Sequence, residues 1–140
     1  MKRFVYITGL LDFPVGIATA APAFIQNDPQ MLPPLLTLGA FLFFAAASLM
    51  WASQDLGTRG CIVVWQGLVR LTAVIATLTA IQMGMPDIMA DLYGMDPGLA
   101  AGILYGICAF DGVISSVYII GMSRMRGHTL LGLLRGLPAH

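Results

Sequence analysis

Residues 61–85 read CIVVWQGLVRLTAVIATLTAIQMGM, an apolar run long enough to cross a bilayer as a helix, and the run contains a single charged residue, Arg70. A guanidinium at membrane depth costs several kcal/mol unless it is paired or hydrated. The rest of the fold must therefore supply partners for Arg70. Two other apolar runs each contain one aspartate, Asp12 and Asp111, and these are the candidate partners.

The composition places the chain in the membrane class. Of its 140 residues, 58% are hydrophobic and only 10% are charged, so the chain is too apolar to cover itself with a water-soluble surface. The two cysteines, Cys61 and Cys108, are far apart and show neither metal nor redox spacing. We therefore expect a multi-pass membrane protein with no disulfide, no metal site and no cofactor.

Four apolar segments are predicted to span the membrane as helices, over residues 4–25, 35–52, 61–85 and 99–122. The connections between them are short, so neighbouring helices are expected to be antiparallel. The sequence thus predicts one domain over residues 1–140, an all-α membrane protein built as an antiparallel bundle of four transmembrane helices.

The connections carry clear turn signals. Residues 26–34 are rich in proline, and residues 53–60 form a short polar link. Pro86 is predicted to end the third helix and to begin an acidic loop over residues 86–98. Asp96 followed by Pro97 then predicts the start of the fourth helix, since aspartate caps free N–H groups and proline at the first helical position loses no hydrogen bond.

The two ends of the chain each allow two interpretations. The first segment resembles a signal peptide, with a basic start and a small-residue run at 18–23 that could be cleaved. Asp12 and Pro14 interrupt its apolar core, which favours retention as a helix. The tail, residues 123–140, places basic residues beside leucines and predicts a short amphipathic helix at the membrane surface. A frayed basic tail is the open alternative.

Charged residues outside the spans separate by sign across the predicted topology. One side has Lys2, Arg3, Arg59, Arg124, Arg126 and Arg135. The other side has Asp28, Asp87, Asp91 and Asp96. The positive-inside rule then predicts a cell (inner) membrane protein with both termini in the cytoplasm.

The three intramembrane charges are predicted to lie in one layer. At a rise of ~1.5 Å per residue, Asp12 lies roughly 12 Å from the predicted cytoplasmic edge, Arg70 roughly 14 Å and Asp111 roughly 17 Å. At 100° per residue, each charge also belongs to a polar stripe on its helix. The stripes are Thr8, Asp12, Gly16 and Thr19; Gln66, Arg70 and Thr77; and Cys108, Asp111, Ser115 and Tyr118.

A ridge of small residues marks the fourth segment, formed by Gly98, Gly102 and Gly106. This spacing favours close helix packing in membranes. The ridge falls opposite Asp111 on a helical projection. If Asp111 points into the bundle, the ridge points outward and becomes a candidate homodimer seam.

Three function classes remain open. Two aspartates and one arginine leave one surplus negative charge, which suits a proton relay and equally a structural cluster with one protonated member. The first class is transport of a small solute coupled to protons or cations. Asp12 and Asp111 would accept the ion, and Arg70 would set the pKa values of these aspartates or hold an anionic substrate. The path would be lined by Thr8, Gln66, Thr77, Ser115 and Tyr118.

The second class is a non-catalytic accessory or assembly subunit of a larger membrane complex, in which the cluster joins the helices. The third is an intramembrane lipid-modifying enzyme that uses the aspartates as acid and base. The sequence shows no nucleotide loop, catalytic serine elbow, zinc spacing or pair of haem-ligand histidines. An enzyme acting on a soluble substrate and a nucleic-acid partner are therefore not expected; the bilayer itself is the expected partner.

Overall fold

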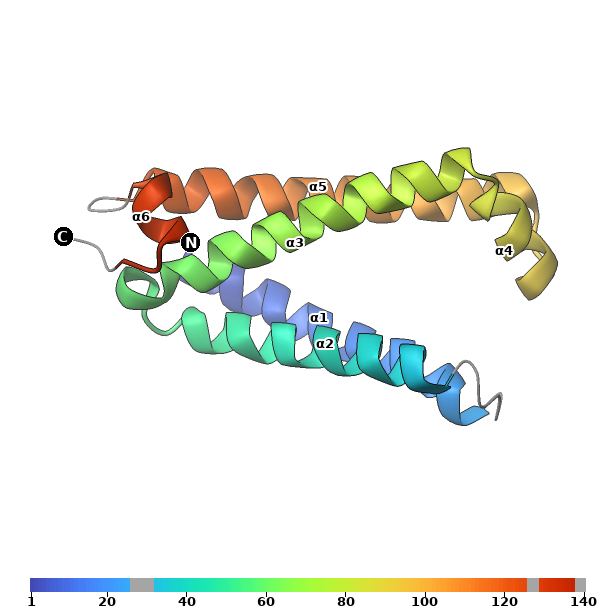
Figure 1. The fold of residues 1–140 in the computed structure, drawn as a ribbon, viewed down its shortest axis with the longest axis horizontal. Coiled ribbons are helices and arrows are strands. Elements are labelled where there is room, and N and C mark those ends of the chain that lie inside the picture. The colour runs from blue at the N-terminus through green and yellow to red at the C-terminus, as the bar shows by residue number, and fades with distance from the viewer. Residues whose placement is uncertain (26–31, 126–128, 138–140) are drawn as a thin grey trace.

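A computed structural model describes residues 1–25, 32–125 and 129–137, and 88% of these described residues are helical, with no strand among them. The helices are α1 (Lys2–Ile25), α2 (Leu32–Ala52), α3 (Leu56–Gln82), α4 (Met85–Tyr93), α5 (Pro97–Ser123) and α6 (Leu130–Leu134) (Figure 1). Four of them, α1, α2, α3 and α5, are long and apolar enough to cross a membrane. The predicted all-helical class with four candidate spans is confirmed.

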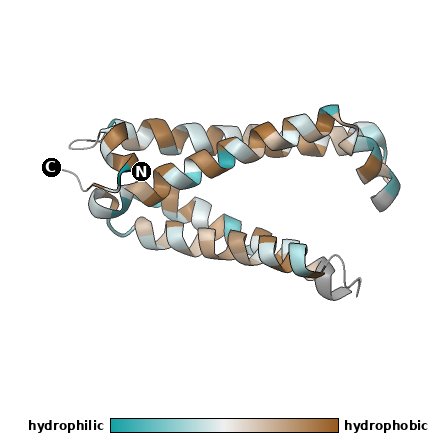
Figure 2. Ribbon diagram, viewed as in Figure 1, coloured by the Kyte–Doolittle hydropathy of each residue, from teal (hydrophilic) through white to brown (hydrophobic). Residues whose placement is uncertain are grey.

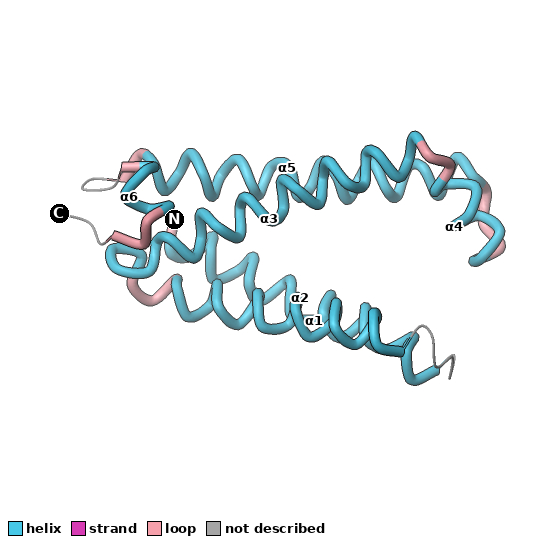
Figure 3. The backbone as a smooth tube through the Cα atoms, viewed as in Figure 1, coloured by secondary structure: helices cyan, strands magenta, loops and turns pink. Residues whose placement is uncertain are grey.

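The long helices associate as two pairs. α1 packs along α2, and α3 packs along α5. The two pairs meet near the N-terminus, the α2–α3 connection and α6, and they diverge toward the other end, where α4 lies (Figure 1). We call the first end the shared end. Short loops join the helices there and beside α4 (Figure 3). Closure of all four helices into one antiparallel bundle stays a prediction.

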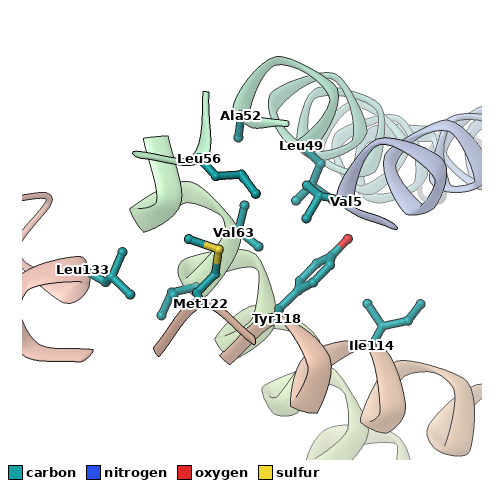
Figure 4. Close-up of a cluster of buried hydrophobic side chains, with 10 residues drawn as sticks. Val5, Leu49, Ala52, Leu56, Val63, Ile114, Tyr118, Met122 and Leu133 are labelled. Carbon is teal, nitrogen blue, oxygen red and sulfur yellow. The ribbon is translucent and has the colours of Figure 1, made fainter. Parts of the chain in front are cut away.

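A cluster of buried side chains holds the pairs together at the shared end (Figure 4). α1, α2, the α3 segment, α5 and α6 all contribute to it. Its members are Val5, Leu49, Ala52, Leu56, Val63, Val64, Ile114, Tyr118, Met122 and Leu133. Leu133 is only 1% exposed, so α6 packs against the body of the protein through this side chain. A short helix does form in the predicted tail; residues 126–128 and 138–140 of that tail lie outside the described residues.

The long helices are made mainly of apolar and neutral residues, with few hydrophilic ones along them (Figure 2). Between 17% and 28% of each apolar window is buried inside the protein. Phe44 is 69% exposed, Ile75 60% and Val113 63%. Apolar faces of this size are unfavourable in water but not in hydrocarbon. A helix can cross hydrocarbon because its backbone groups are hydrogen-bonded within the helix.

α3 begins at Leu56, five residues before the predicted start, and the predicted link over 53–60 is correspondingly too long. The reason is the cap at Asp55. Its Oδ1 accepts hydrogen bonds from the backbone N–H of Gly57 at 3.0 Å and of Thr58 at 3.4 Å, and its Oδ2 accepts from the Thr58 hydroxyl at 2.7 Å. These bonds satisfy donors that the first turn of a helix leaves free.

The Asp55 cap should make the stability of the start of α3 depend on pH. The hydrogen bond from the Thr58 hydroxyl, followed by the backbone bonds, lowers the pKa of the Asp55 carboxyl from its ordinary value. The stabilisation is therefore complete above the ordinary aspartate pKa and is lost as the pH falls through the lowered value. We expect Asp55→Asn to lower the thermal unfolding midpoint at neutral pH, with a gap that narrows in strong acid; a constant gap would contradict this account.

The predicted acidic loop over 86–98 is wrong, because most of it is helix α4. α3 ends at Gln82, before Pro86, and Gly84 reverses the chain with a φ of 91°, a conformation that glycine adopts without strain. Pro86 then lies in the first turn of α4, where its missing N–H costs nothing. The predicted start of the fourth span is confirmed within two residues, since Asp96 Oδ1 accepts from the Leu99 N–H at 3.1 Å.

Outside the charge layer of Asp12, Arg70 and Asp111, basic and acidic residues gather at opposite ends of the molecule. The shared end contains the starts of α1 and α3 and the ends of α5 and α6 (Figure 1). Its basic residues are Lys2, Arg3, Arg59, Arg124 and Arg135, and Asp55 is the one acidic residue described there. The α4 end has Asp87, Asp91 and Asp96 and no basic residue among those described. Asp28 and Arg126 lie outside the described residues.

Glycines bring α1 and α2 into close contact. A Cβ atom on Gly16 would lie 2.8 Å from the backbone nitrogen of Phe43, and one on Gly39 would lie 2.6 Å from the Cβ of Ala20. By contrast, the Gly98, Gly102 and Gly106 ridge of α5 is uncovered by another described helix, because a Cβ on Gly102 or Gly106 would meet nothing within 4 Å. Gly16 and Gly39 therefore bring α1 and α2 closer together than Gly67 brings α3 and α5, where an added Cβ would lie 3.1 Å from Ile119.

Candidate functional site

Arg70 forms ion pairs with both intramembrane aspartates. Its Nη2 atom pairs with Oδ2 of Asp12, and its Nη1 atom pairs with Oδ1 of Asp111. Each of these hydrogen bonds joins a charged donor to a charged acceptor, the strongest common class. The side chains of Asp12, Arg70 and Asp111 are 17%, 14% and 20% exposed, so the cluster remains partly accessible.

Three helices place these charges in one layer. Asp12 lies in the first half of α1, whereas Arg70 and Asp111 lie near the middle of α3 and α5. The guanidinium presents its N–H donors in a planar fork, so two of its nitrogens can bind separate carboxylates at the same time. Arg70 thereby joins the α1–α2 pair to the α3–α5 pair at a level beyond the buried cluster.

A cavity of about 560 Å³ opens beside the three charges, and all four long helices line it. Its polar walls are Asp12, Gln66, Arg70 and Asp111. Its remaining walls are Val15, Phe41, Leu42, Ala45, Val69, Ala73, Ile103, Gly106, Ile107 and Phe110. The volume lies in the range of small-molecule sites, which combine mostly apolar walls with a few polar groups.

Thr8 and Tyr118 are not among the described walls of the cavity; Tyr118 belongs to the buried cluster and Thr8 is hydrogen-bonded to it. Tyr118 is fully buried and Thr8 is 5% exposed. The Thr8 hydroxyl donates to the carbonyl of Phe4 or Val5 at 3.0 Å, so its hydrogen bond with the Tyr118 hydroxyl leaves the tyrosine as donor. In Figure 4 the Tyr118 ring points from α5 toward the α1–α2 side. The hydrogen bond between Thr8 and Tyr118 joins the two helix pairs between the charge layer and the shared end.

Ser115 joins α5 to α3. It is 2% exposed, and its hydroxyl donates to the backbone carbonyl of Gly67 at 2.7 Å. Thr77 is half-buried farther along α3, and the described walls of the cavity do not include it. The structure thus brings Asp12, Gln66, Arg70 and Asp111 to the cavity and gives Thr8, Ser115 and Tyr118 contacts between helices.

Several walls of the cavity have no signal in the sequence. α2 has no charge, yet Phe41, Leu42 and Ala45 form its side of the cavity. Gly106 also lines the cavity, although the helical projection assigns it to the outward ridge opposite Asp111. Such apolar positions resemble any lipid-facing position of a membrane helix, so only the packing of the helices distinguishes them.

The chemistry of the site is set by charge. With both aspartates ionised the cluster carries one negative charge, and one bound proton or monovalent cation neutralises it. Within the described residues, no group of three or more His, Cys, Asp or Glu side chains could hold a metal ion. Cys61 and Cys108 are free thiols.

The chain matches no protein-family model, and no curated protein or solved structure matches it.

Proposed function

We propose that this chain is an inner-membrane protein that transports a small solute coupled to protons or monovalent cations. One observation carries the proposal: the cavity of about 560 Å³ is bordered by two carboxylates that share a single guanidinium. Ionisable groups inside a membrane are costly, and where they border an accessible cavity they mark ion and substrate pathways.

The coupling follows from the surplus negative charge. Arg70 compensates one carboxylate, and the second is neutral only when a proton or a cation is bound. A solute that competes for the same carboxylate displaces that ion, which links the movement of the two. Gln66 adds a neutral donor and acceptor to the same wall of the cavity.

The segregation of charge supports the orientation. In the proposed arrangement the four long helices form an antiparallel bundle across the membrane, and the basic shared end with both termini faces the cytoplasm. The acidic α4 end faces the opposite side. The cavity then lies between the two helix pairs, on the side toward which they diverge.

Asp12→Asn and Asp111→Asn should each abolish coupled flux, because an amide neither binds the proton nor carries the charge that holds a cation. The purified protein is reconstituted into liposomes that contain a pH-sensitive dye. Sodium or potassium salts, and then a panel of small organic solutes, are added outside, and proton movement is followed. We expect ion-dependent or solute-dependent signals with the natural chain and background signals with both variants.

Thr72→Ala is the matched control. Thr72 is exposed on α3 two residues from Arg70, and its hydroxyl bonds only within its own helix, to the Leu68 carbonyl at 3.0 Å. This variant should keep full flux. Flux that is unchanged in both aspartate variants would exclude the transport proposal.

An accessory subunit of a larger membrane complex is the second candidate, and the two completed ion pairs of Arg70 favour it. In that role the cluster only joins the helix pairs. Of the predicted seam of Gly98, Gly102 and Gly106, Gly106 also lines the cavity, so the uncovered Gly98 and Gly102 would serve as the contact for a second copy or for another membrane protein. Co-purification with a stoichiometric partner, together with absent flux, would select this candidate; isolation as a stable active oligomer would exclude it.

A further inference from the structure

A second hollow lies at the shared end, where α1 begins beside the end of α2. Its volume is about 320 Å³, and it is lined by Lys2, Arg3, Tyr6 and Ile7 of α1 and by Ser53. The Lys2 ammonium donates to the backbone carbonyl of Gln54 at 3.3 Å, which holds the start of α1 against the α2–α3 connection. The hollow is therefore formed by two segments that are distant in the sequence.

Lys2 and Arg3 line this hollow, whose exposed walls are mostly apolar. Neither residue forms an ion pair within the described part of the chain, where both ion pairs belong to Arg70. Asp55, the acid of the neighbouring connection, uses both its oxygens to cap α3. An ammonium has three N–H donors and a guanidinium five, so Lys2 and Arg3 keep free donors for an anion. Tyr6 is 45% exposed and also lines the hollow.

An apolar strip leads away from the hollow along α1. Arg3, Ile7 and Leu10 are spaced at i, i+4 and i+7 and therefore share one face of the helix. Ile7 and Leu10 are 52% and 50% exposed, and no described helix covers them. A ligand with an anionic head and apolar chains could place the head against Lys2 and Arg3 and the chains on this strip.

Aromatic residues place the hollow at the boundary between membrane and water. Trp51 is 51% exposed at the last turn of α2, and the guanidinium of Arg59 lies 4.0 Å from its ring centroid. Arg59 also donates to the Trp51 carbonyl at 3.1 Å. Tryptophan and tyrosine concentrate at the level of lipid headgroups, which is where a headgroup site must lie.

We propose that Lys2 and Arg3, at this hollow, bind the phosphate of an anionic phospholipid. Lys2 and Arg3 hold the phosphate oxygens, Tyr6 donates a further hydrogen bond, and the acyl chains lie along Ile7 and Leu10. The headgroup of a zwitterionic lipid has a cationic group that the two basic side chains repel, so a lipid of net negative charge is preferred. Inorganic phosphate shares the head chemistry but cannot use the apolar strip, and it should bind far more weakly.

The test compares binding to the full-length purified chain in detergent. Short-chain phosphatidylglycerol, the phosphatidylcholine of equal chain length, or inorganic phosphate is titrated, and bound lipid is counted by native mass spectrometry. Phosphatidylglycerol should bind best. The double variant Lys2→Gln with Arg3→Gln should weaken its binding at least about tenfold, because basic side chains near the headgroups supply the attraction. Circular dichroism checks that the variant keeps its helices.

Arg124→Gln with Arg135→Gln is the matched control, since it removes two exposed positive charges from the same end outside the hollow. This variant should bind phosphatidylglycerol within about twofold of the natural chain, because the headgroup is held by local donors. Equal losses in both double variants would show general surface attraction and would overturn the site. Equal binding of phosphatidylcholine, or an equal affinity for inorganic phosphate, would also overturn the assignment to an anionic phospholipid.

Discussion

Replacing Arg70 with leucine should destabilise the protein by about 3 kcal/mol, the typical loss when one partner of a buried ion pair is removed. The substitution leaves Asp12 and Asp111 beside the same cavity with no cation between them. It also removes the polar contact that joins the two helix pairs above the buried cluster. The measurement is the thermal unfolding midpoint of the purified protein in detergent at neutral pH.

A triple variant separates charge from packing. Asp12→Asn and Asp111→Asn are added to Arg70→Leu, so that the layer contains no charge. We expect this variant to regain most of the lost stability, because the unpaired carboxylates are the source of the loss. Flux should stay absent in both variants. If Arg70→Leu alone unfolds at the same temperature as the natural chain, Arg70 does not stabilise the junction of the pairs.

Gly16→Ala should cost about 2 kcal/mol, because the added methyl group would overlap backbone atoms of α2 that cannot move alone. The new Cβ would lie 2.8 Å from the Phe43 nitrogen and 3.1 Å from the Gly39 carbonyl oxygen. α1 and α2 would have to separate along their contact, which weakens the packing that small residues allow in membranes. Gly39→Ala should act in the same way, through the Gly16 carbonyl oxygen at 2.9 Å.

Gly102→Ala is the control for this prediction. The same methyl group on α5 would meet nothing within 4 Å. The thermal unfolding midpoint of the monomer should therefore be unchanged or slightly higher, because alanine suits a helix interior better than glycine does. If the α5 ridge joins two copies of the chain, Gly102→Ala should instead shift the oligomer toward monomer, as seen by crosslinking in liposomes. Equal unfolding temperatures for Gly16→Ala and Gly102→Ala would contradict the assignment of the close contact to α1 and α2.

Much of the fold was predictable because single helices follow local rules. Apolar length indicates four spans, and Asp96 with Pro97 indicates where α5 begins. α4 was missed because Pro86 ends one helix and begins another equally well, and the choice depends on the left-handed turn at Gly84. The early start of α3 depends in the same way on the bonds that Asp55 makes in the folded chain.

The site was predictable only in its charges. Rise and rotation along a helix are regular, so depth and face can be counted for Asp12, Arg70 and Asp111 before any packing is known. Hydroxyl groups were harder to assign, because Ser115 and Tyr118 lie on the same stripe as Asp111 yet form hydrogen bonds between helices. The divergence of the helix pairs has no local signal, and the apolar walls of the cavity follow from it.

The junction of the pairs at one end has a mechanical consequence. Close packing at Gly16 and Gly39 joins α1 to α2 as one arm, and the Ser115–Gly67 hydrogen bond joins α3 to α5 as the other. A helix of 24 residues is about 36 Å long at a rise of ~1.5 Å per residue. Rotation of one arm by about 10° around the buried cluster would move its far tip by about 6 Å, while the side chains at the pivot shift by a fraction of that. The charge layer lies part of the way along the two arms. A small change in the ion pairing of Arg70 would therefore be accompanied by a larger displacement of the helix ends far from the buried cluster.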